Sequence, residues 1–476
     1  MLFNSFPYML VFLPAAILLA KLARSWGGWR AAQGCVLISS VLFYGYAKPQ
    51  NLWYLAGSIL VNWLFGRWLG NTHEALPRRR ILQVGLGLNV CFLCVFKYAN
   101  LFFHSVPWLV ERGVIIPDLE FPLGISFFTI TQIMYLVNCH EGAIRPSTLF
   151  DHATFVSFFP YVVSGPISRA KRILHQFPNI ANPDDSGRSE MARGVYIFAM
   201  GLSKKAVLSG AFAQAAEFGF AEAHTISSLE AWVFATLYAL YVYFDFSGYS
   251  DMAIGSALML GIHVSPNFDA PYQATSIIDF WQRWHISLTS FITNYLYTPL
   301  VRALGKRTWI VTSLSTVLAM SIVGLWHDLR WTFLIFGLIH GFALAINQNW
   351  RTWKMPKLPS AVGWFTMMIV VDVGFVFFHA TTVSAAMAYL PRLVAPHHLF
   401  GLDVVRHMNG HDLQSVLSYA IQVIGVVIAF TGKSSEARAR DFSPSWGYLA
   451  QAVALLCLAC LFVNSNLAKP FVYFAF

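Results

Sequence analysis

The sequence predicts an all-α polytopic membrane protein, and three observations support this class. Of 476 residues, 57% are hydrophobic and only 11% are charged, whereas a soluble domain usually carries about 25% charged residues. Nearly charge-free stretches recur along the whole chain, and many extend through polar edges to the roughly 17–25 residues that a spanning helix needs. Lysine and arginine gather between alternate stretches, as the positive-inside rule predicts. We therefore expect about 10 to 12 transmembrane helices.

The first predicted span lies at the N-terminus. No lysine or arginine precedes the first apolar run, and Lys21, Arg24 and Arg30 follow it. This order is unlike that of a cleaved signal peptide, whose basic residues come first. We expect a span whose N-terminus is extracytoplasmic and whose other end is cytoplasmic.

Later spans are predicted by further apolar stretches: Val84–Phe96, Trp232–Phe246, Trp309–Leu325, Trp364–Phe378, Val416–Phe430 and Tyr448–Val463. If spans alternate in direction, the main basic clusters are cytoplasmic: Lys21–Arg30, Arg67–Arg80, Arg169–Arg172, Arg302–Arg307, Arg351–Lys357 and Lys433–Arg440. Topology and anionic lipid then account for the net charge of +10, so no nucleic-acid partner is expected. The same alternation places the C-terminus outside the cytoplasm.

The middle of the chain is irregular for a simple helix bundle. Thr154–Pro166 is apolar but is interrupted by proline and glycine, and Asn267–Tyr297 mixes aromatic residues with charged and amide side chains. Such backbone is tolerated at membrane depth only inside protein or along a wet cavity. We expect re-entrant or buried short helices here, packed inside a ring of spanning helices. The polar stretch Asn179–Arg193 predicts a cytoplasmic loop.

Familiar metal and soluble-enzyme motifs are missing. The CxxC spacings at Cys91–Cys94 and Cys457–Cys460 lie among apolar residues without nearby histidine or acid, so they predict helix-packing residues, with no structural disulfide and no metal. The sequence contains no nucleophile elbow, Walker A loop or dinucleotide fingerprint. An internal repeat is not evident either, which disfavours an inverted-repeat transporter.

Two short stretches predict the site of chemistry: Arg283-Trp284-His285 and Gly324-Leu325-Trp326-His327. Polar groups at membrane depth are costly and usually mark a site, and histidine is well suited to take up and return a proton near neutral pH. His327 ends an apolar run at a break between two spans, which favours a functional role. For His285, a catalytic role and that of a hydrogen-bonded core residue both stay open.

Polar residues nearby extend the candidate centre. Asp245, Ser247 and Asp251 alternate with aromatic residues in Tyr243–Ala253, where Gly248 permits close backbone approach. These residues either support a site or pack helices with their acids hydrogen-bonded internally. Arg283 stands four residues after Asp279, so we expect a structural ion pair on one helix face.

At these residues the chain resembles the membrane-bound O-acyltransferase superfamily, in the bacterial branch of the alginate O-acetyltransferase membrane subunits and related exopolysaccharide acetylases. Its motifs occur in the family order: Phe121–Phe128, Phe158–Pro160 with Gly165–Ile167, Tyr243–Ala253, Phe280-Trp281 with Arg283–Leu288, Tyr295–Tyr297 with Pro299-Leu300, and Gly324–His327. The resemblance implies one integral-membrane domain over residues 1–476, with core motifs in 121–345 and a C-terminal aromatic motif at 470–476.

The resemblance also implies roles. His327 occupies the position of the catalytic histidine and His285 that of a supporting histidine, in a ring of helices around a thin centre. Acetyl-coenzyme A is the implied donor, entering from the cytoplasm of a bacterial inner membrane, and no bound cofactor is expected. An extracytoplasmic acetyltransferase partner and a polysaccharide acceptor are implied outside, with Asp245, Ser247, Asp251, Arg283 and Trp326 supporting the site.

The C-terminal motif adds a candidate acyl relay. Residues 470–476 resemble a terminal motif, found also in small partner peptides of D-alanyl transfer, in which a tyrosine is proposed to carry the acyl group. Tyr473 is the corresponding residue. An interfacial aromatic anchor is the alternative.

Two departures from the family pattern lie close to the expected site. Thr293-Asn294 stands where Arg-Asp is common, and Asp328 follows His327 where glycine is usual. The acceptor therefore cannot be copied from alginate. Two other functions stay open: D-alanyl transfer to teichoic acid from a carrier protein, and transport of a lipid-linked sugar.

Overall fold

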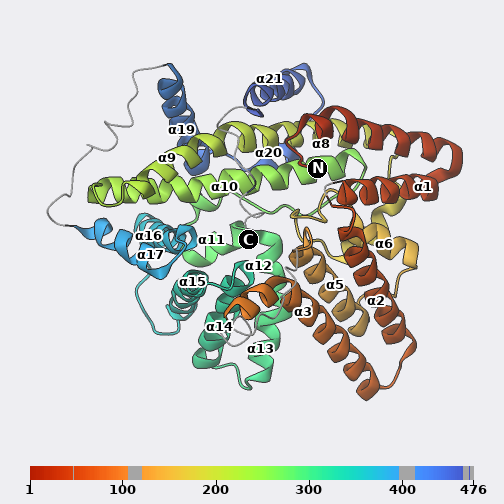
Figure 1. Ribbon diagram of the computed structural model, residues 1–476, viewed down its shortest axis with the longest axis horizontal. Helices are drawn as coiled ribbons and strands as arrows, with labels where there is room; N and C mark the ends of the chain where they lie inside the picture. Colours follow the sequence, from red (N-terminus) through yellow and green to blue (C-terminus); the bar gives the residue numbers. More distant parts are fainter. Residues whose placement is uncertain (47, 106–120, 396–412, 465–470, 472–476) are drawn as a thin grey trace. The chain divides into compact units, whose positions relative to one another are not determined.

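The chain is an all-α polytopic membrane protein, as predicted. The structure, a computed structural model, describes residues 1–46, 48–105, 121–395, 413–464 and 471. Within these ranges the chain forms helices and no strand (Figure 1). Six helical stretches in the described part are long and apolar enough to cross a membrane: Pro7–Gly45, Ala75–Tyr98, Asp185–Ala221, Trp309–His327, Trp331–Asn349 and Ser360–His379. The ring of 10 to 12 spans stays a prediction.

Two compact units make up the chain. Unit 1 comprises Met1–Phe198 with Met252–Ser265, and unit 2 comprises Ala199–Asp251 with Pro266–Phe476. The division falls inside two helices, α8 and α10. The single integral-membrane domain stays a prediction.

Unit 1 contains the N-terminal helices: η1 (Pro7–Phe12), α1 (Leu13–Gly45), α2 (Asn51–Asn71), α3 (Ala75–Ser105), α5 (Ile125–His140), α6 (Leu149–Ser157), α7 (Ala170–Ile173), η2 (Leu174–Asn179) and most of α8 (Asp185–Ser203). Helix α1 is broken at Gly27 and Gly28, where Gly28 has φ 69°, a conformation that glycine adopts without steric cost. The break falls in the basic cluster predicted to follow the first span.

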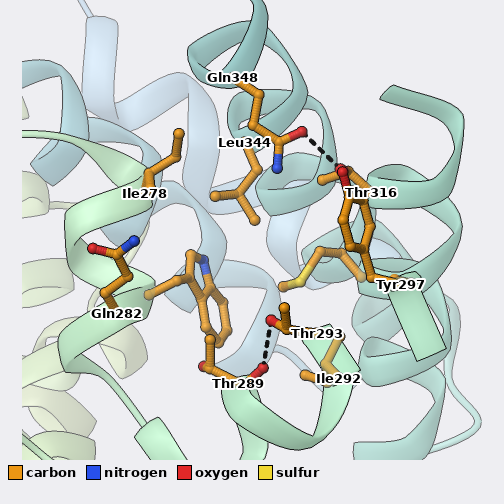
Figure 2. Close-up of a pocket in the computed structure, with 12 residues that line it drawn as sticks. Ile278, Gln282, Thr289, Ile292, Thr293, Tyr297, Thr316, Leu344 and Gln348 are labelled. Carbon is orange, nitrogen blue, oxygen red and sulfur yellow. Dashed lines mark hydrogen bonds between the residues drawn. The ribbon is translucent and has the colours of Figure 1, made fainter. Parts of the chain in front are cut away.

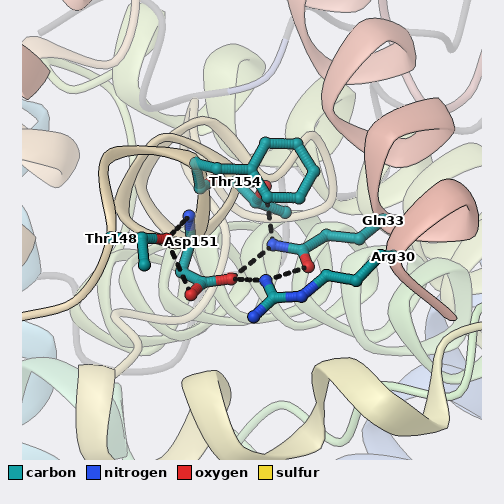
Figure 3. Close-up of polar contacts among 6 residues, drawn as sticks. Arg30, Gln33, Thr148, Asp151 and Thr154 are labelled. Atoms are coloured by element: carbon teal, nitrogen blue, oxygen red, sulfur yellow. Dashed lines mark hydrogen bonds and ion pairs between the residues drawn. The ribbon is translucent and has the colours of Figure 1, made fainter.

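A polar network ties α6 to the second half of α1 (Figure 3). Arg30 and Gln33 of α1 both bond the Asp151 carboxylate, and the amide of Gln33 also donates to the Thr154 hydroxyl at 3.2 Å. The Thr148 hydroxyl caps α6 by accepting the backbone N–H of Asp151 at 3.1 Å. The carboxylate of Asp151 therefore connects α6 to α1, and its backbone N–H bonds the residue that caps α6.

One prediction in unit 1 is confirmed and another is partly wrong. α6 ends at Ser157 and residues 159–164 form turns, as proline and glycine in Thr154–Pro166 predicted. The predicted loop Asn179–Arg193 is helical from Asp185, which lies in the first turn of α8. An acid there stabilises the partial positive charge of the helix N-terminus, so a polar stretch was mistaken for a loop.

Unit 2 contains η3 (Lys204–Leu208), α9 (Ser209–Ala221), most of α10 (Ser228–Met259), η4 (Pro271–Gln273), α11 (Ile277–Arg283), α12 (Ile286–Phe291), η5 (Ile292–Tyr297), α13 (Thr298–Ala303), α14 (Trp309–His327), α15 (Trp331–Asn349), α16 (Ser360–His379), α17 (Val383–Tyr389), η6 (Leu390–Val394), α19 (Leu413–Thr431), α20 (Ser435–Arg440) and α21 (Trp446–Phe462). The short buried helices predicted for Asn267–Tyr297 are η4, α11 and α12.

Helices α14 and α15 form a tight antiparallel pair (Figure 1). A Cβ atom on Gly341 would lie 3.0 Å from the Cα of Val317, and one on Gly337 would lie 3.0 Å from the Cα of Ser321. Small residues at such positions let two backbones approach closely in a membrane, where packing drives helix association. This close pair carries His327 at the end of α14.

Candidate active site

His285 sits at a break between two short helices. The Ser276 hydroxyl caps the N-terminus of α11 by accepting a hydrogen bond from the backbone N–H of Asp279 at 3.1 Å. Between α11 and α12, His285 has φ 43° and is 1% exposed. A non-glycine residue in this left-handed region costs about 1–3 kcal/mol, and such strain recurs at functional sites.

Asn267 fixes the orientation of the His285 ring. Its Oδ1 accepts the backbone N–H of Ser287 at 3.3 Å and the Ser287 hydroxyl at 2.9 Å. The same oxygen lies 3.0 Å from Nδ1 of His285, so Nδ1 carries the proton and donates. Burial lowers the pKa of His285 to about 3. The ring is therefore neutral at physiological pH, with its lone pair on Nε2.

Both predicted aspartates are paired with lysines that the sequence analysis did not identify. Lys205 forms an ion pair with Asp245, and both side chains are almost fully buried. Lys204 donates to Asp251 at 2.7 Å and to the Ser435 hydroxyl at 2.7 Å. The two lysines are neighbours in the π-helix η3, a form that is frequent at functional sites. Two adjacent lysines inside an apolar stretch were the sequence feature that could have indicated buried ion pairs.

The segment between these aspartates packs closely. A Cβ atom on Gly248 would lie 2.7 Å from the carbonyl oxygen of Gly201, which confirms the predicted close approach. Ser247 is fully buried, and its hydroxyl has no hydrogen-bond partner among the described residues. Asp245 and Asp251 thus hold helices together, while Ser247 adds a polar group without such a bond.

One residue of the C-terminal aromatic motif lies within the described residues. Phe471 is 3% exposed and stacks on Tyr249 with ring centres 4.2 Å apart. Its ring also lies 5.8 Å from that of Phe246, whose own ring contacts His285 at 4.6 Å. The ammonium of Lys205 stands 5.7 Å from the Phe471 ring centre. Phe471 itself is therefore separated from His285 by one aromatic ring, that of Phe246; Tyr473 is outside the described residues.

His327 is the last residue of α14 and is 5% exposed. Rings from three helices surround it: Trp326 at 4.9 Å, Phe333 at 6.2 Å, Phe336 at 6.4 Å and Phe378 at 5.5 Å. This surrounding lowers the local dielectric constant and thereby strengthens any charge interaction that the imidazole makes.

Aromatic contacts connect the two histidines within unit 2. Trp284, next to His285, contacts Phe375 at 5.6 Å. Phe375 contacts Phe378 at 5.7 Å, and Phe378 contacts His327 at 5.5 Å. The fold therefore joins two motifs that are far apart in the sequence through a continuous set of rings.

The charged residues beside the motifs form partly exposed pairs. Arg283 donates through Nε to Asp279 at 2.7 Å, as the four-residue spacing predicted. Asp328 accepts from Nε of Arg330 at 2.6 Å. All four side chains are about a third exposed. Asp328 thus pairs with Arg330 in the described structure.

A cavity of about 200 Å³ lies among α11, α12, η5, α14 and α15. Trp281, Met320 and Leu344 supply apolar walls, and Figure 2 shows Leu344 among the lining residues. A polar pair lines it too, with the Thr316 hydroxyl donating to Oε1 of Gln348 at 2.9 Å. Thr293, one of the departures from the family pattern, is also a wall residue. The departure at Thr293 therefore lies in the wall of this cavity.

Comparison with known proteins identifies the family. Residues 79–390 match the family described as MBOAT, membrane-bound O-acyltransferase family. A peptidoglycan O-acetyltransferase of Helicobacter pylori is 32% identical over 93% of this chain and 91% of its own. A probable alginate O-acetylase of Azotobacter vinelandii is 33% identical over 91% of this chain and 85% of its own.

A more limited likeness involves a teichoic acid D-alanyltransferase of Streptococcus thermophilus. It is 29% identical over 48% of this chain and 57% of its own length. The two O-acetyltransferases are therefore similar over nearly the whole chain, and the D-alanyltransferase over about half.

Proposed function

The chain belongs to the membrane-bound O-acyltransferase family, and from this premise we propose that it transfers an acetyl group from cytoplasmic acetyl-coenzyme A across the bacterial inner membrane. The acetyl group serves O-acetylation of an extracytoplasmic polysaccharide. The likeness to two O-acetyltransferases over more than nine-tenths of the chain favours acetyl over D-alanyl transfer.

One structural observation carries the proposal: a buried histidine and a cavity share one helix face. Thr316 and Met320 line the cavity, and His327 follows Met320 by seven residues on α14. Residues four and seven apart on a helix lie on the same face. A donor arm lying in the cavity therefore extends along α14 toward the imidazole.

His327 is assigned the role of general base. It takes the proton of an acceptor hydroxyl while that oxygen attacks the thioester carbonyl carbon. As the tetrahedral intermediate collapses, the carbon–sulfur bond breaks and the coenzyme A thiolate leaves. The imidazolium then returns the proton to the thiolate sulfur, so His327 is restored.

His285 is assigned a positioning role. Its Nδ1–H is engaged by Asn267, and its neutral Nε2 carries a lone pair. A lone pair accepts a hydrogen bond and does not stabilise an oxyanion. We therefore favour His285 as an acceptor that orients a substrate hydroxyl or amide, and not as a donor to the oxyanion.

Tyr473 is the proposed relay hydroxyl. Phe471 is anchored against Tyr249 and Phe246, next to His285, which supports docking of the C-terminal motif at the site. An outer partner protein then moves the acetyl group from Tyr473 to the polysaccharide. This sequence of steps requires an extracytoplasmic C-terminus.

The test uses purified protein and radiolabelled acetyl-coenzyme A. We expect label on wild-type protein, none on His327→Ala, and none on Tyr473→Phe. Label that persists in Tyr473→Phe but disappears in His327→Ala would keep the enzyme and remove the relay. Full labelling of a well-folded His327→Ala would contradict the mechanism.

The two alternatives give different results in the same preparation. D-alanyl transfer requires a loaded carrier protein, so label from D-alanyl carrier with none from acetyl-coenzyme A would favour it. A sugar transporter needs two compartments and cleaves no thioester. Acyl transfer in detergent would therefore exclude transport as the sole activity.

A further inference from the structure

A third buried histidine, His340, lies between the cavity and the rings around His327. His340 is 1% exposed on α15. Leu344 and Gln348, four and eight residues later, line the cavity. Phe336, four residues earlier, contacts His340 at 4.6 Å and His327 at 6.4 Å. Because residues at these spacings follow one face of a helix, His340 occupies the middle of that face.

His340 accepts a hydrogen bond from Trp281, the largest residue that lines the cavity. The indole Nε1–H of Trp281 donates to Nδ1 of His340 at 3.3 Å, and the two rings meet edge-on with centres 5.3 Å apart. Trp281 comes from α11 and lines the cavity. An imidazole accepting through Nδ1 carries its proton on Nε2. A leucine of similar size would fill the space but offer Trp281 no acceptor.

The surroundings of His340 leave the ring little freedom. Its Nε2 faces Gly374 of α16, where a Cβ atom would lie only 2.6 Å away. Among the described residues Nε2 has no hydrogen-bond partner. A buried N–H without an acceptor costs free energy. The hydrogen bond that Nδ1 of His340 accepts from Trp281 offsets part of this cost.

We propose that His340 is a positioning residue that fixes the Trp281 indole as a wall of the donor cavity and thereby limits the acyl chain to a short one. This inference rests on the proposed function, because it takes the cavity to receive the acyl thioester. Without the acceptor, the indole is free to leave its place, and the cavity gains room for a longer chain.

The test compares acetyl- with butyryl-coenzyme A as donors for wild type, His340→Leu, Trp281→Phe and the double variant. In His340→Leu and in Trp281→Phe, the butyryl-to-acetyl ratio of kcat/KM should rise about tenfold, the size expected for loss of one hydrogen bond. Since both changes remove the same bond, the double variant should move the ratio no further than either single variant.

Two further variants control the test. His340→Gln keeps an acceptor for Trp281 and should retain the wild-type ratio. His379→Leu removes a half-buried histidine of α16 that contacts Phe220 and Tyr238, and it too should leave the ratio unchanged. A loss of folding alone lowers both rates but does not change their ratio.

The outcomes separate the two claims. An unchanged ratio in His340→Leu, or an additive double variant, would overturn the role of His340 and leave the proposed function intact. Wild-type protein that transfers neither acyl group would overturn the proposed function, and with it the inference.

Discussion

The two histidines of the candidate site stand in different surroundings. His285 is held by a strained backbone and by the amide oxygen of Asn267. His327 ends a regular helix among aromatic rings from α14, α15 and α16. Because the Asn267 contact fixes the tautomer of His285, its Nε2 is suited to accept a hydrogen bond from a substrate, whereas aromatic rings line the imidazole of His327. In the proposed mechanism, His285 has the positioning role and His327 the role in proton transfer.

The largest expected effect separates these roles directly. Replacing His327 with glutamine should lower acetyl transfer about 10³-fold, within the range of general base catalysis. His285→Gln, which retains an acceptor oxygen, should lower it only about tenfold. Steady-state kcat with acetyl-coenzyme A measures both, with the melting temperature as a control for folding. Equal losses of kcat in the two variants would contradict different roles for His327 and His285.

A second prediction concerns the buried ion pair between Lys205 and Asp245. Lys205→Met leaves the buried Asp245 carboxylate without its lysine and should reduce the free energy of unfolding by about 3–5 kcal/mol. Lys205→Met with Asp245→Leu should recover most of this loss, because no buried charge then stays alone. Thermal unfolding in detergent compares the two. A double variant as unstable as the single one would assign Lys205 another role.

A third prediction sharpens the role of Asn267. Asn267→Leu removes the acceptor for Nδ1 and should lower acetyl transfer about tenfold. Combined with His285→Gln it should cause little further loss, because both changes act through the same contact. Rates of the two single variants and the double variant give the coupling. Multiplicative losses would show that Asn267 acts independently of His285.

The smallest expected effect concerns Phe471. Phe471→Ala removes the ring that stacks on Tyr249 and should lower acetyl transfer a few-fold, about the value of one aromatic pair. Phe471→Trp retains a stacked ring and should restore most of the rate. Labelling of the protein by acetyl-coenzyme A measures both. If Phe471→Ala labels as fast as wild type, docking of the C-terminal motif does not need this contact.

Much of the candidate site was predictable from local patterns, and part of it was not. The Asp279–Arg283 pair follows from four-residue spacing, and the close packing of Gly248 follows from its aromatic setting. The lysines that pair with Asp245 and Asp251 lie 40 and 47 residues earlier in the chain, where no spacing rule connects them. His340 was not predicted because a single histidine in an apolar helix does not reveal which residue it contacts.

The sequence by itself determined the membrane class, the apolar stretches that form helices and the family, because hydrophobicity and motif order are properties of neighbouring residues. The tertiary structure decided which polar groups meet. It placed Lys205 against Asp245, Asn267 against His285 and Trp281 against His340. Each of these contacts joins separate segments, and a buried polar group takes whichever partner the packing of helices brings within hydrogen-bonding distance.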